Sequence, residues 1–460
     1  MSRRRIAAYA ALATCALAAG CAPGPRPQVA RAAFAWGDNG SVQLGDGSGG
    51  ARQGPVRVAG LTDVRAVRAG YLHSVALLGD GTVWVWGRDW GSGIGAELTD
   101  FGFRACADLV SDCHPAPVPL KDQAGAALPA ARAIGAGWAH GLLVGASDGA
   151  VWSWGDNARG QLGYTTDGFW TGPQPRRTSL AGPVASGPDR ILAVVGGSDF
   201  SLALQSGPPA LTAWVWGKND QGQLAVNLNT DPDAIVIETQ RMRPARVPGL
   251  GQDLIALAAG LSHVLALLAD GTVWGWGAND QIQIDNRPAP GTSASFFSPI
   301  QVMEFIQGTG TRPLTHVTDI AAGCTHSLAL TSDGKVLSWG NEEYGQRAQV
   351  DADFFDTVRG IHWNVQEVQG LGAGGATVRA VAAGCNFSLA LLSDGTVWAW
   401  GENSAGQLGQ ATTTTCTIRR TGRSQIVPCS HTPLQVPGLA GVEAISAGYR
   451  HSLAVVREGG

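Results

Sequence analysis

The chain is 460 residues long, with 65 glycines and 16 tryptophans, and only 15% of its residues are charged. Its formal net charge is −4 at pH 7, and no basic run follows the N-terminal segment. A general nucleic-acid-binding protein would carry a clustered lysine and arginine face, so we expect no nucleic-acid partner.

The first residues resemble an export signal. Arg3–Arg5 precede an apolar stretch, Ile6–Ala19, which is too short to cross a bilayer comfortably. The stretch leads into Leu-Ala-Ala-Gly-Cys, which looks like a bacterial lipoprotein cleavage box. We therefore expect residues 1–20 to be a cleaved signal peptide, Cys21 to be lipidated, and residues 21–31 to be a tether. Ordinary secretory cleavage and an uncleaved anchor are the alternatives.

One phrase returns about every sixty residues through the rest of the chain, seven times in all. One half reads Ala-Gly-x-x-His-Ser-Leu-Ala-Leu, as in Ala322–Leu330, and the other reads Val-Trp-x-Trp-Gly, as in Val397–Gly401. Each half alternates apolar with small or polar residues, which is the pattern of a strand. A period of this length indicates an array of units that cannot bury their apolar faces alone.

The halves are joined by Asp-Gly, as at Asp80-Gly81, which predicts a two-residue hairpin turn with positive φ at both positions. The third copy has Ser206–Pro209 instead, so a longer turn is expected there. A Gln-Leu-Gly piece and a second pair of short strands follow each Trp-Gly. Four strands per unit without helical periodicity predict an all-β fold, a seven-bladed β-propeller of four-stranded blades.

The two ends of the repeat region complement each other. The first unit begins with only the Trp-Gly half (Phe34–Gly37), and the last ends with only the His-Ser half (His451–Val456). We therefore expect the N-terminal strand to complete the last blade, so that residues 32–457 form one closed propeller without exposed sheet edges.

These phrases resemble the repeat of the regulator of chromosome condensation family, as a bacterial, exported member. The resemblance implies a seven-bladed propeller. The departures are Phe200 and Phe387 at the His position and Gln281–Ile284 in place of Gly-Gln-Leu. Eukaryotic members act as guanine nucleotide exchange factors for a small GTPase, and secreted bacterial members inhibit β-lactamases by covering the active site with one face. The shared residues belong to the scaffold, so the resemblance transfers no exchange-factor residue.

Six cysteines remain after Cys15 and Cys21. Export would place them where disulfides persist. Cys106 with Cys113, and Cys416 with Cys429, are the expected local bridges. Cys324 and Cys385 occupy the same position in adjacent repeats and are expected to be small buried residues, with a bridge as the alternative. No cysteine and histidine spacing resembles a zinc site, so no metal and no cofactor is expected.

The recurring histidines predict structure rather than catalysis, because two repeats carry phenylalanine, which neither binds metal nor transfers protons. We expect each to cap backbone groups within its blade; they are His73, His140, His263, His326 and His451. Ser147 matches a Gly-x-Ser-x-Gly motif, but it aligns with a hairpin turn and not with a strand-to-helix elbow. No catalytic residue is expected.

The repeats vary between the Gln-Leu-Gly piece and the next Pro-x-x-Val strand, from about 9 residues (46–54) to about 23 (410–432). All expansions are expected at this one point, and thus on one face, where insertions usually bind partners. Aromatic residues here predict a binding surface, or small satellite cores beneath the loops. They are Trp90, Phe101, Phe103, Phe169, Trp170, Phe296, Phe297, Phe354, Phe355 and Trp363.

The sequence thus predicts a non-catalytic binding scaffold that recognises another protein or a cell-envelope component through this face. We expect a monomer outside the cytoplasm, attached to the membrane only by a lipid, or secreted. The alternatives are a guanine nucleotide exchange factor-like regulator, by resemblance, and an enzyme with a site in the central tunnel.

Overall fold

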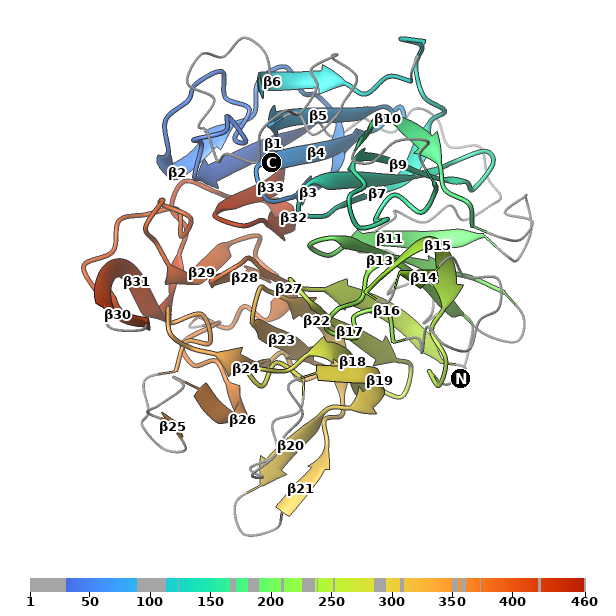
Figure 1. Ribbon diagram of the computed structural model, residues 1–460. Helices are drawn as coiled ribbons and strands as arrows, with labels where there is room; N and C mark the ends of the chain where they lie inside the picture. The colour runs from blue at the N-terminus through green and yellow to red at the C-terminus, as the bar shows by residue number, and fades with distance from the viewer. Residues whose placement is uncertain are drawn as a thin grey trace, which may run out of the picture.

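The computed structural model describes residues 30–88, 113–122, 124–165, 171–180, 190–207, 211–225, 236–237, 239–250, 253–284, 295–306, 310–349, 355–356, 361–372, 374–420 and 423–458. Within these ranges every regular element is a strand, and seven sheets surround a common axis (Figure 1). We number the sheets as blades 1 to 7, in the order in which their innermost strands occur along the chain.

The innermost strands line the axis, and they are β3 (Val64–Ala69), β7 (Ala131–Ala136), β11 (Ile191–Gly196), β16 (Leu254–Ala259), β22 (Val317–Ala322), β27 (Val378–Ala383) and β32 (Val442–Ala447). The second strands carry the His-Ser phrase, and they are β4 (His73–Leu78), β8 (His140–Gly145), β12 (Phe200–Gln205), β17 (His263–Leu268), β23 (His326–Thr331), β28 (Phe387–Leu392) and β33 (His451–Arg457).

The third strands carry the Trp-Gly phrase, and they are β5 (Val83–Arg88), β9 (Val151–Asp156), β13 (Thr212–Lys218), β18 (Val273–Ala278), β24 (Val336–Asn341), β29 (Val397–Glu402) and β1 (Arg31–Gly37). The outer strands are β6 (Cys113–Pro119), β10 (Thr171–Arg177), β15 (Gln240–Arg246), β19 (Ser295–Gln301), β26 (Ile361–Glu367), β31 (Arg423–Gln435) and β2 (Arg52–Arg57). This order confirms the predicted seven-bladed propeller.

The ring closes as predicted. Blade 7 has the strand order β2-β1-β33-β32, so two strands from the start of the chain complete a sheet begun by its end. The pairing of β1 with β33 runs from Arg31 opposite Arg457 to Gly37 opposite His451. Ala35 and Trp36 in β1 are fully buried. Closure therefore combines a hydrogen-bonded ladder with apolar packing.

Three blades have a fifth strand, and one connection carries an extra hairpin. The strands β14 (Val236–Ile237), β25 (Phe355–Asp356) and β30 (Thr415–Arg420) extend the outer strands of blades 3, 5 and 6. The hairpin of β20 (Met303–Ile306) and β21 (Gly310–Pro313) lies between blades 4 and 5 and projects from the outer edge of the propeller (Figure 1). The expectation that every expansion joins the third and fourth strands was therefore wrong. The two strands of this hairpin satisfy each other's backbone hydrogen bonds. The hairpin can therefore be inserted in the connection between the outer strand of blade 4 and the innermost strand of blade 5.

The Asp-Gly turns form hairpins, but not of the predicted two-residue type. At the Asp80-Gly81 turn of blade 1, Gly81 has a positive φ of 87° and Asp80 does not. The Gly81 amide donates to Leu78 O at 3.0 Å, and the Leu78 amide donates to Thr82 O at 3.0 Å, so three residues form the loop. The Asp80 carboxylate accepts the Thr82 amide at 2.8 Å, and this local bond favours a type I turn with glycine at its end. The third copy has the longer turn that we predicted, because β12 ends at Gln205 and β13 begins at Thr212.

The apolar cores lie between adjacent blades. The second tryptophan of the Trp-x-Trp-Gly phrase is fully buried in most blades, as for Trp86 in blade 1. Trp86 packs in one cluster with Leu44 and Leu453, which both belong to blade 7. Its indole nitrogen also donates to Gln43 O of blade 7 at 2.8 Å. Each unit therefore buries its apolar face against its neighbour, as expected for a repeat array.

Candidate functional site at the mouth of the axial channel

The recurring histidines link neighbouring blades, which corrects the prediction that they cap backbone groups within one blade. His326 Nε2 in blade 5 lies 2.9 Å from Ser388 Oγ in blade 6. Ser388 Oγ and Trp400 Nε1 both donate to Gln346 O, at 2.8 and 2.9 Å. A Cβ on Gly323 would lie 2.3 Å from the His326 ring, so glycine is needed for this packing. Equivalent pairs join His140 to Ser201, His263 to Ser327, and His451 to Ser74.

Burial lowers the pKa of four of these histidines to about 3, so they are neutral at physiological pH; they are His140, His263, His326 and His451. Blade 3 has Phe200 at the histidine position, and blade 4 has Val264 at the serine position. Both side chains lie in one apolar cluster. An apolar pair thus replaces a polar pair at one blade junction, which agrees with the structural role that the sequence predicts.

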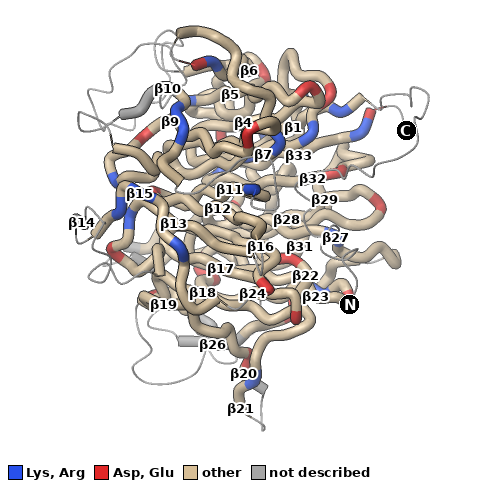
Figure 2. Tube along the Cα trace, turned by 90° about the vertical axis from the view of Figure 1, so that its right-hand side faces the viewer, with Lys and Arg blue, Asp and Glu red and all other residues tan. Residues whose placement is uncertain are grey.

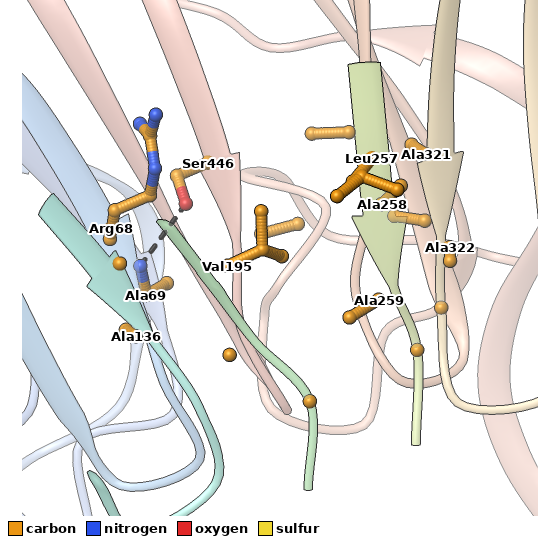
Figure 3. A pocket seen from close by; sticks show the side chains of 18 of the residues that line it. Arg68, Ala69, Ala136, Val195, Leu257, Ala258, Ala259, Ala321, Ala322 and Ser446 are labelled. Atoms are coloured by element: carbon orange, nitrogen blue, oxygen red, sulfur yellow. Dashed lines mark hydrogen bonds between the residues drawn. The ribbon is translucent and has the colours of Figure 1, made fainter. Parts of the chain in front are cut away.

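The axis is occupied by a channel of about 440 Å³ that the innermost strands line. Its wall is mostly alanine, valine, leucine and glycine, as the small side chains of β7, β16 and β22 show in Figure 3. Arg68 and Asp319 are the charged residues among the described lining residues. Asp319 accepts the amides of Val381 at 3.2 Å and Ile320 at 3.0 Å, and burial raises the pKa of its carboxyl to about 6.

A belt of backbone hydrogen bonds surrounds one end of this channel, at the turns between first and second strands. The Tyr449 amide donates to Gly70 O at 3.2 Å, and the Tyr71 amide donates to Trp138 O at 3.3 Å. The Cys324 amide donates to Cys385 O at 3.2 Å, and similar bonds start from Trp138, Leu261 and Cys385. The residue after the glycine of the Ala-Gly phrase therefore marks the rim of the channel mouth in each blade.

Three of these rim residues form an aromatic cluster, which we call the aromatic rim: Tyr71, Trp138 and Tyr449. The rings of Tyr71 and Trp138 stack with centroids 4.2 Å apart, and Tyr449 lies 4.2 Å from Tyr71. All three side chains are half-buried. Burial, followed by the neighbouring Tyr449, raises the pKa of Tyr71 to about 12. The rings thus form one rigid platform that solvent still reaches.

The rim also holds a disulfide, which was the alternative prediction for its two cysteines. Cys324 and Cys385 are bonded, with Cα atoms 4.4 Å apart, and are not merely small buried residues. The reason is their position, because the residues after this glycine in adjacent repeats meet around the axis. The covalent bond therefore joins blade 5 to blade 6 on the circle that carries the aromatic rim.

Two aspartates, Asp156 and Asp199, lie in the backbone segments that contact the turn at Trp138. The Asp156 amide donates to Ala139 O at 2.9 Å, and the Trp138 amide donates to Ser198 O at 3.3 Å, next to Asp199. Burial raises the pKa of both aspartates, and the nearby Asp199 raises the pKa of Asp156 further. Lys218 Nζ lies 3.8 Å from Asp199. The aromatic face of the rim suits a cationic group.

Elsewhere the charges are mixed. In the view of Figure 2, lysine and arginine lie at β9 and β15 and also near β1 and β33, with acidic residues among them. Arg177 pairs with Asp148 at 2.6 Å, and the Arg246 guanidinium lies over the Trp214 ring at 5.1 Å. These arginines therefore have partners within the protein.

Most of the predicted loop aromatics lie outside the described residues, so their exposure stays a prediction. This holds for Trp90, Phe101, Phe103, Phe169, Trp170 and Phe354. The backbones of Phe355 and Trp363 lie in β25 and β26. Phe296 is half-buried, and Phe297 is 55% exposed. Ile426 on β31, which the sequence analysis missed, is 69% exposed.

Both exposed side chains lie on fourth strands, Phe297 on β19 and Ile426 on β31, and these strands follow the connections from the third strands. In a blade of antiparallel strands, these connections leave from the same end as the turns that carry the aromatic rim. We call this side the loop-bearing face. The aromatic rim is not among the residues predicted from the sequence. The residue after Ala-Gly is aromatic in three repeats, and this pattern could have indicated the rim, but these repeats meet only when the ring closes.

The predicted bridge between Cys416 and Cys429 is confirmed. Cys113 is also disulfide-bonded, whereas Cys106 lies outside the described residues, as does Cys21. Among the described residues, no helix is long and apolar enough to span a membrane.

Comparison with known proteins agrees with this architecture. The RCC1-like domain matches residues 177–460, and two RCC1 repeat descriptions match residues 32–77, 148–204 and 131–161. The ultraviolet-B receptor UVR8 of Arabidopsis thaliana is 25% identical over 394 residues, covering 85% of this chain and 74% of the receptor. The secretion-regulating guanine nucleotide exchange factor of Bos taurus is 28% identical over 331 residues, covering 71% of this chain and 64% of that protein.

Among solved structures, Prp20p from Saccharomyces cerevisiae has a TM-score of 0.71 at 18% identity, covering 99% of this chain and 95% of Prp20p. Human WBSCR16 has a TM-score of 0.68 at 20% identity, covering 93% of this chain and 99% of that chain. Because the match of the RCC1-like domain spans more than half of the sequence, the chain belongs to the RCC1-like family of β-propellers.

Proposed function

We propose that this protein is a non-catalytic binding scaffold that recognises another protein through its loop-bearing face. The observation that carries the proposal is the aromatic rim, with Asp156 and Asp199 in the segments that contact the turn at Trp138. Aromatic side chains on a rigid support are common anchors at protein interfaces. An exposed aromatic face attracts a lysine or arginine side chain through cation–π interaction. The partner therefore presents a basic side chain to the channel mouth.

The family and the channel both support a binding role. Prp20p has been described with binding properties to Gsp1p and histones, so a related ring binds other proteins. In the described part of the chain, no histidine or glutamate lines the axial channel, and Asp319 there already accepts two backbone amides. A tunnel enzyme would bring several polar groups together at the axis.

The test begins with capture from a cell-envelope extract by protein that lacks residues 1–20. Candidates are then purified, and their affinity is measured directly. We expect Trp138→Ala and Asp156→Asn to weaken binding at least tenfold, and added salt to weaken it further. The matched control is Phe305→Ala on the β20–β21 hairpin, which should bind normally. Equal affinity for all three variants would contradict the proposed site.

A second candidate is regulation of a small GTPase, which the similarity to the secretion-regulating guanine nucleotide exchange factor favours. It predicts that the protein accelerates release of a fluorescent guanine nucleotide from a GTPase. If a panel of GTPases releases the nucleotide at the intrinsic rate while the protein still binds another partner, only the scaffold role is supported.

We also propose that the protein is lipidated at Cys21 and held outside the cytoplasm. The support is the basic and apolar segment that precedes this residue. Metabolic labelling with a lipid probe should mark the wild type and not Cys21→Ser. Equal labelling of both would contradict lipidation at this residue.

A further inference from the structure

The β30–β31 insertion of blade 6 brings together three potential metal ligands. Sγ of Cys416, Sγ of Cys429 and a ring nitrogen of His431 lie within 4.8 Å of one another. The two cysteines are joined as a disulfide, and His431 Nε2 lies 3.3 Å from Cys416 Sγ. Both cysteines are buried, and Tyr344 of blade 5 packs against their cluster.

A carboxylate holds the other side of the His431 ring. Glu342 Oε1 in blade 5 lies 3.4 Å from His431 Nδ1, and the glutamate side chain is only 5% exposed. Glu342 also accepts the amides of Arg347 at 2.6 Å and Gln349 at 3.1 Å, so its position is fixed. A carboxylate that accepts the Nδ1 proton leaves the Nε2 lone pair directed at the sulfurs. Histidines that bind metals have this arrangement.

Glu342 departs from the repeat in a way that the fold alone does not require. Five other blades have asparagine at this position, and its side-chain oxygen accepts the amide five residues later, as Asn403 does from Leu408 at 3.0 Å. Glu342 Oε2 does the same for Arg347. Asparagine would therefore complete the turn, but it would offer an amide group where Glu342 presents its second oxygen to His431.

We propose that Cys416, Cys429 and His431 form a zinc site when the disulfide is reduced, with Glu342 as the residue that positions His431. A dithiol reductant supplies two electrons and two protons to the disulfide and is itself oxidised to a disulfide. Zn²⁺ then displaces both thiol protons and binds two thiolates and the neutral imidazole. This ligand set suits zinc, and water completes the tetrahedron, because the His431 side chain is 36% exposed.

The consequence is an insertion that is anchored in either redox state. Under oxidising conditions the disulfide joins Cys416 to Cys429, and under reducing conditions the metal joins the same residues and adds His431. Because Glu342 of blade 5 already contacts His431 in the disulfide form, the insertion is held to the neighbouring blade in both states.

The test uses the whole chain without residues 1–20, either oxidised or reduced, and measures bound Zn²⁺ against a chelating dye. We expect one equivalent in the reduced wild type and none in the oxidised protein. His431→Ala should weaken binding at least about a hundredfold, and Glu342→Asn, which restores the residue of other repeats, by about ten- to a hundredfold. The double variant Cys324→Ser/Cys385→Ser is the control and should keep the full affinity.

Alkylation gives a readout that does not depend on stoichiometry. Zn²⁺ should slow the alkylation of Cys416 and Cys429 in the reduced wild type and not in His431→Ala, which can fold with its disulfide before reduction. Equal zinc affinity in the wild type and His431→Ala, zinc binding by the oxidised form, or no protection of these two cysteines would each overturn the proposal.

Discussion

At the scale of single residues, the repeat is maintained by polar groups that are buried between blades. His326, Ser388 and the carbonyl of Gln346 form one chain of contacts across a junction. Buried polar groups are costly unless they are paired, so these residues specify how one blade meets the next. Neutral imidazole is required, because burial strongly disfavours its charged form.

This requirement predicts a dependence of stability on pH. The pKa of four histidines falls to about 3 on folding, so the unfolded chain binds more protons below about pH 6.5. Stability should therefore fall as the pH decreases, by about 1.4 kcal/mol per pH unit for each histidine. His326→Phe, which copies the third and sixth repeats, should remove one histidine's share of this slope in denaturant titrations between about pH 6 and pH 4. An unchanged slope would mean that His326 is protonated in the folded state.

At the scale of elements, strands and hairpins could be predicted from the sequence because each depends on local alternation and on a turn beside it. Blade 1 shows this, since only the geometry of the turn at Asp80 differed. The aromatic rim and the bond between Cys324 and Cys385 could not be predicted in this way. Their members come from different repeats and are brought together only by the radius of the closed ring. Glu342 and His431 were missed for the same reason, because 89 residues separate them.

The two disulfides should contribute differently to stability. The Cys324–Cys385 bond closes 61 residues and joins two blades, whereas Cys416–Cys429 closes 13 within one insertion. If the bridges act through chain entropy, they contribute roughly 4 and 3 kcal/mol. Double serine variants of each pair, unfolded by denaturant under oxidising conditions, should show the larger loss for Cys324 and Cys385. A smaller loss there than for the other pair would indicate that the hydrogen-bonded belt holds blades 5 and 6 together without the bridge.

At the scale of the whole molecule, stability depends on circular closure, because each apolar cluster is shared by two blades. Blade 7 is assembled from both ends of the chain, with β1 paired to β33 along its whole length. Trp36 of β1 packs with Phe387 and Leu408 of blade 6. A break at blade 7 therefore exposes the packing surfaces of two further blades.

Deletion of residues 30–40 or 447–460 should destabilise the entire ring. Each deletion removes one member of the β1–β33 ladder and leaves buried side chains such as Leu453 or Trp36 without cover. A large apolar side chain contributes about 1.5–3 kcal/mol, so losing several exceeds the stability of a typical domain, about 5–15 kcal/mol. Thermal unfolding should shift sharply downward, and a dye for exposed apolar surface should bind.

A circular permutant separates the loss of pairing from the change of chain ends. The Glu458 amide donates to Ala30 O at 2.8 Å, so a short turn can join Ala30 to Glu458, while new ends are opened between Gly370 and Gly372, outside any strand. This permutant keeps every strand pair and should unfold close to the wild type, whereas the deletions should not. If the deletions unfold at the wild-type temperature, pairing between the ends is dispensable. If the permutant is as unstable as the deletions, the covalent order of the blades matters more than closure.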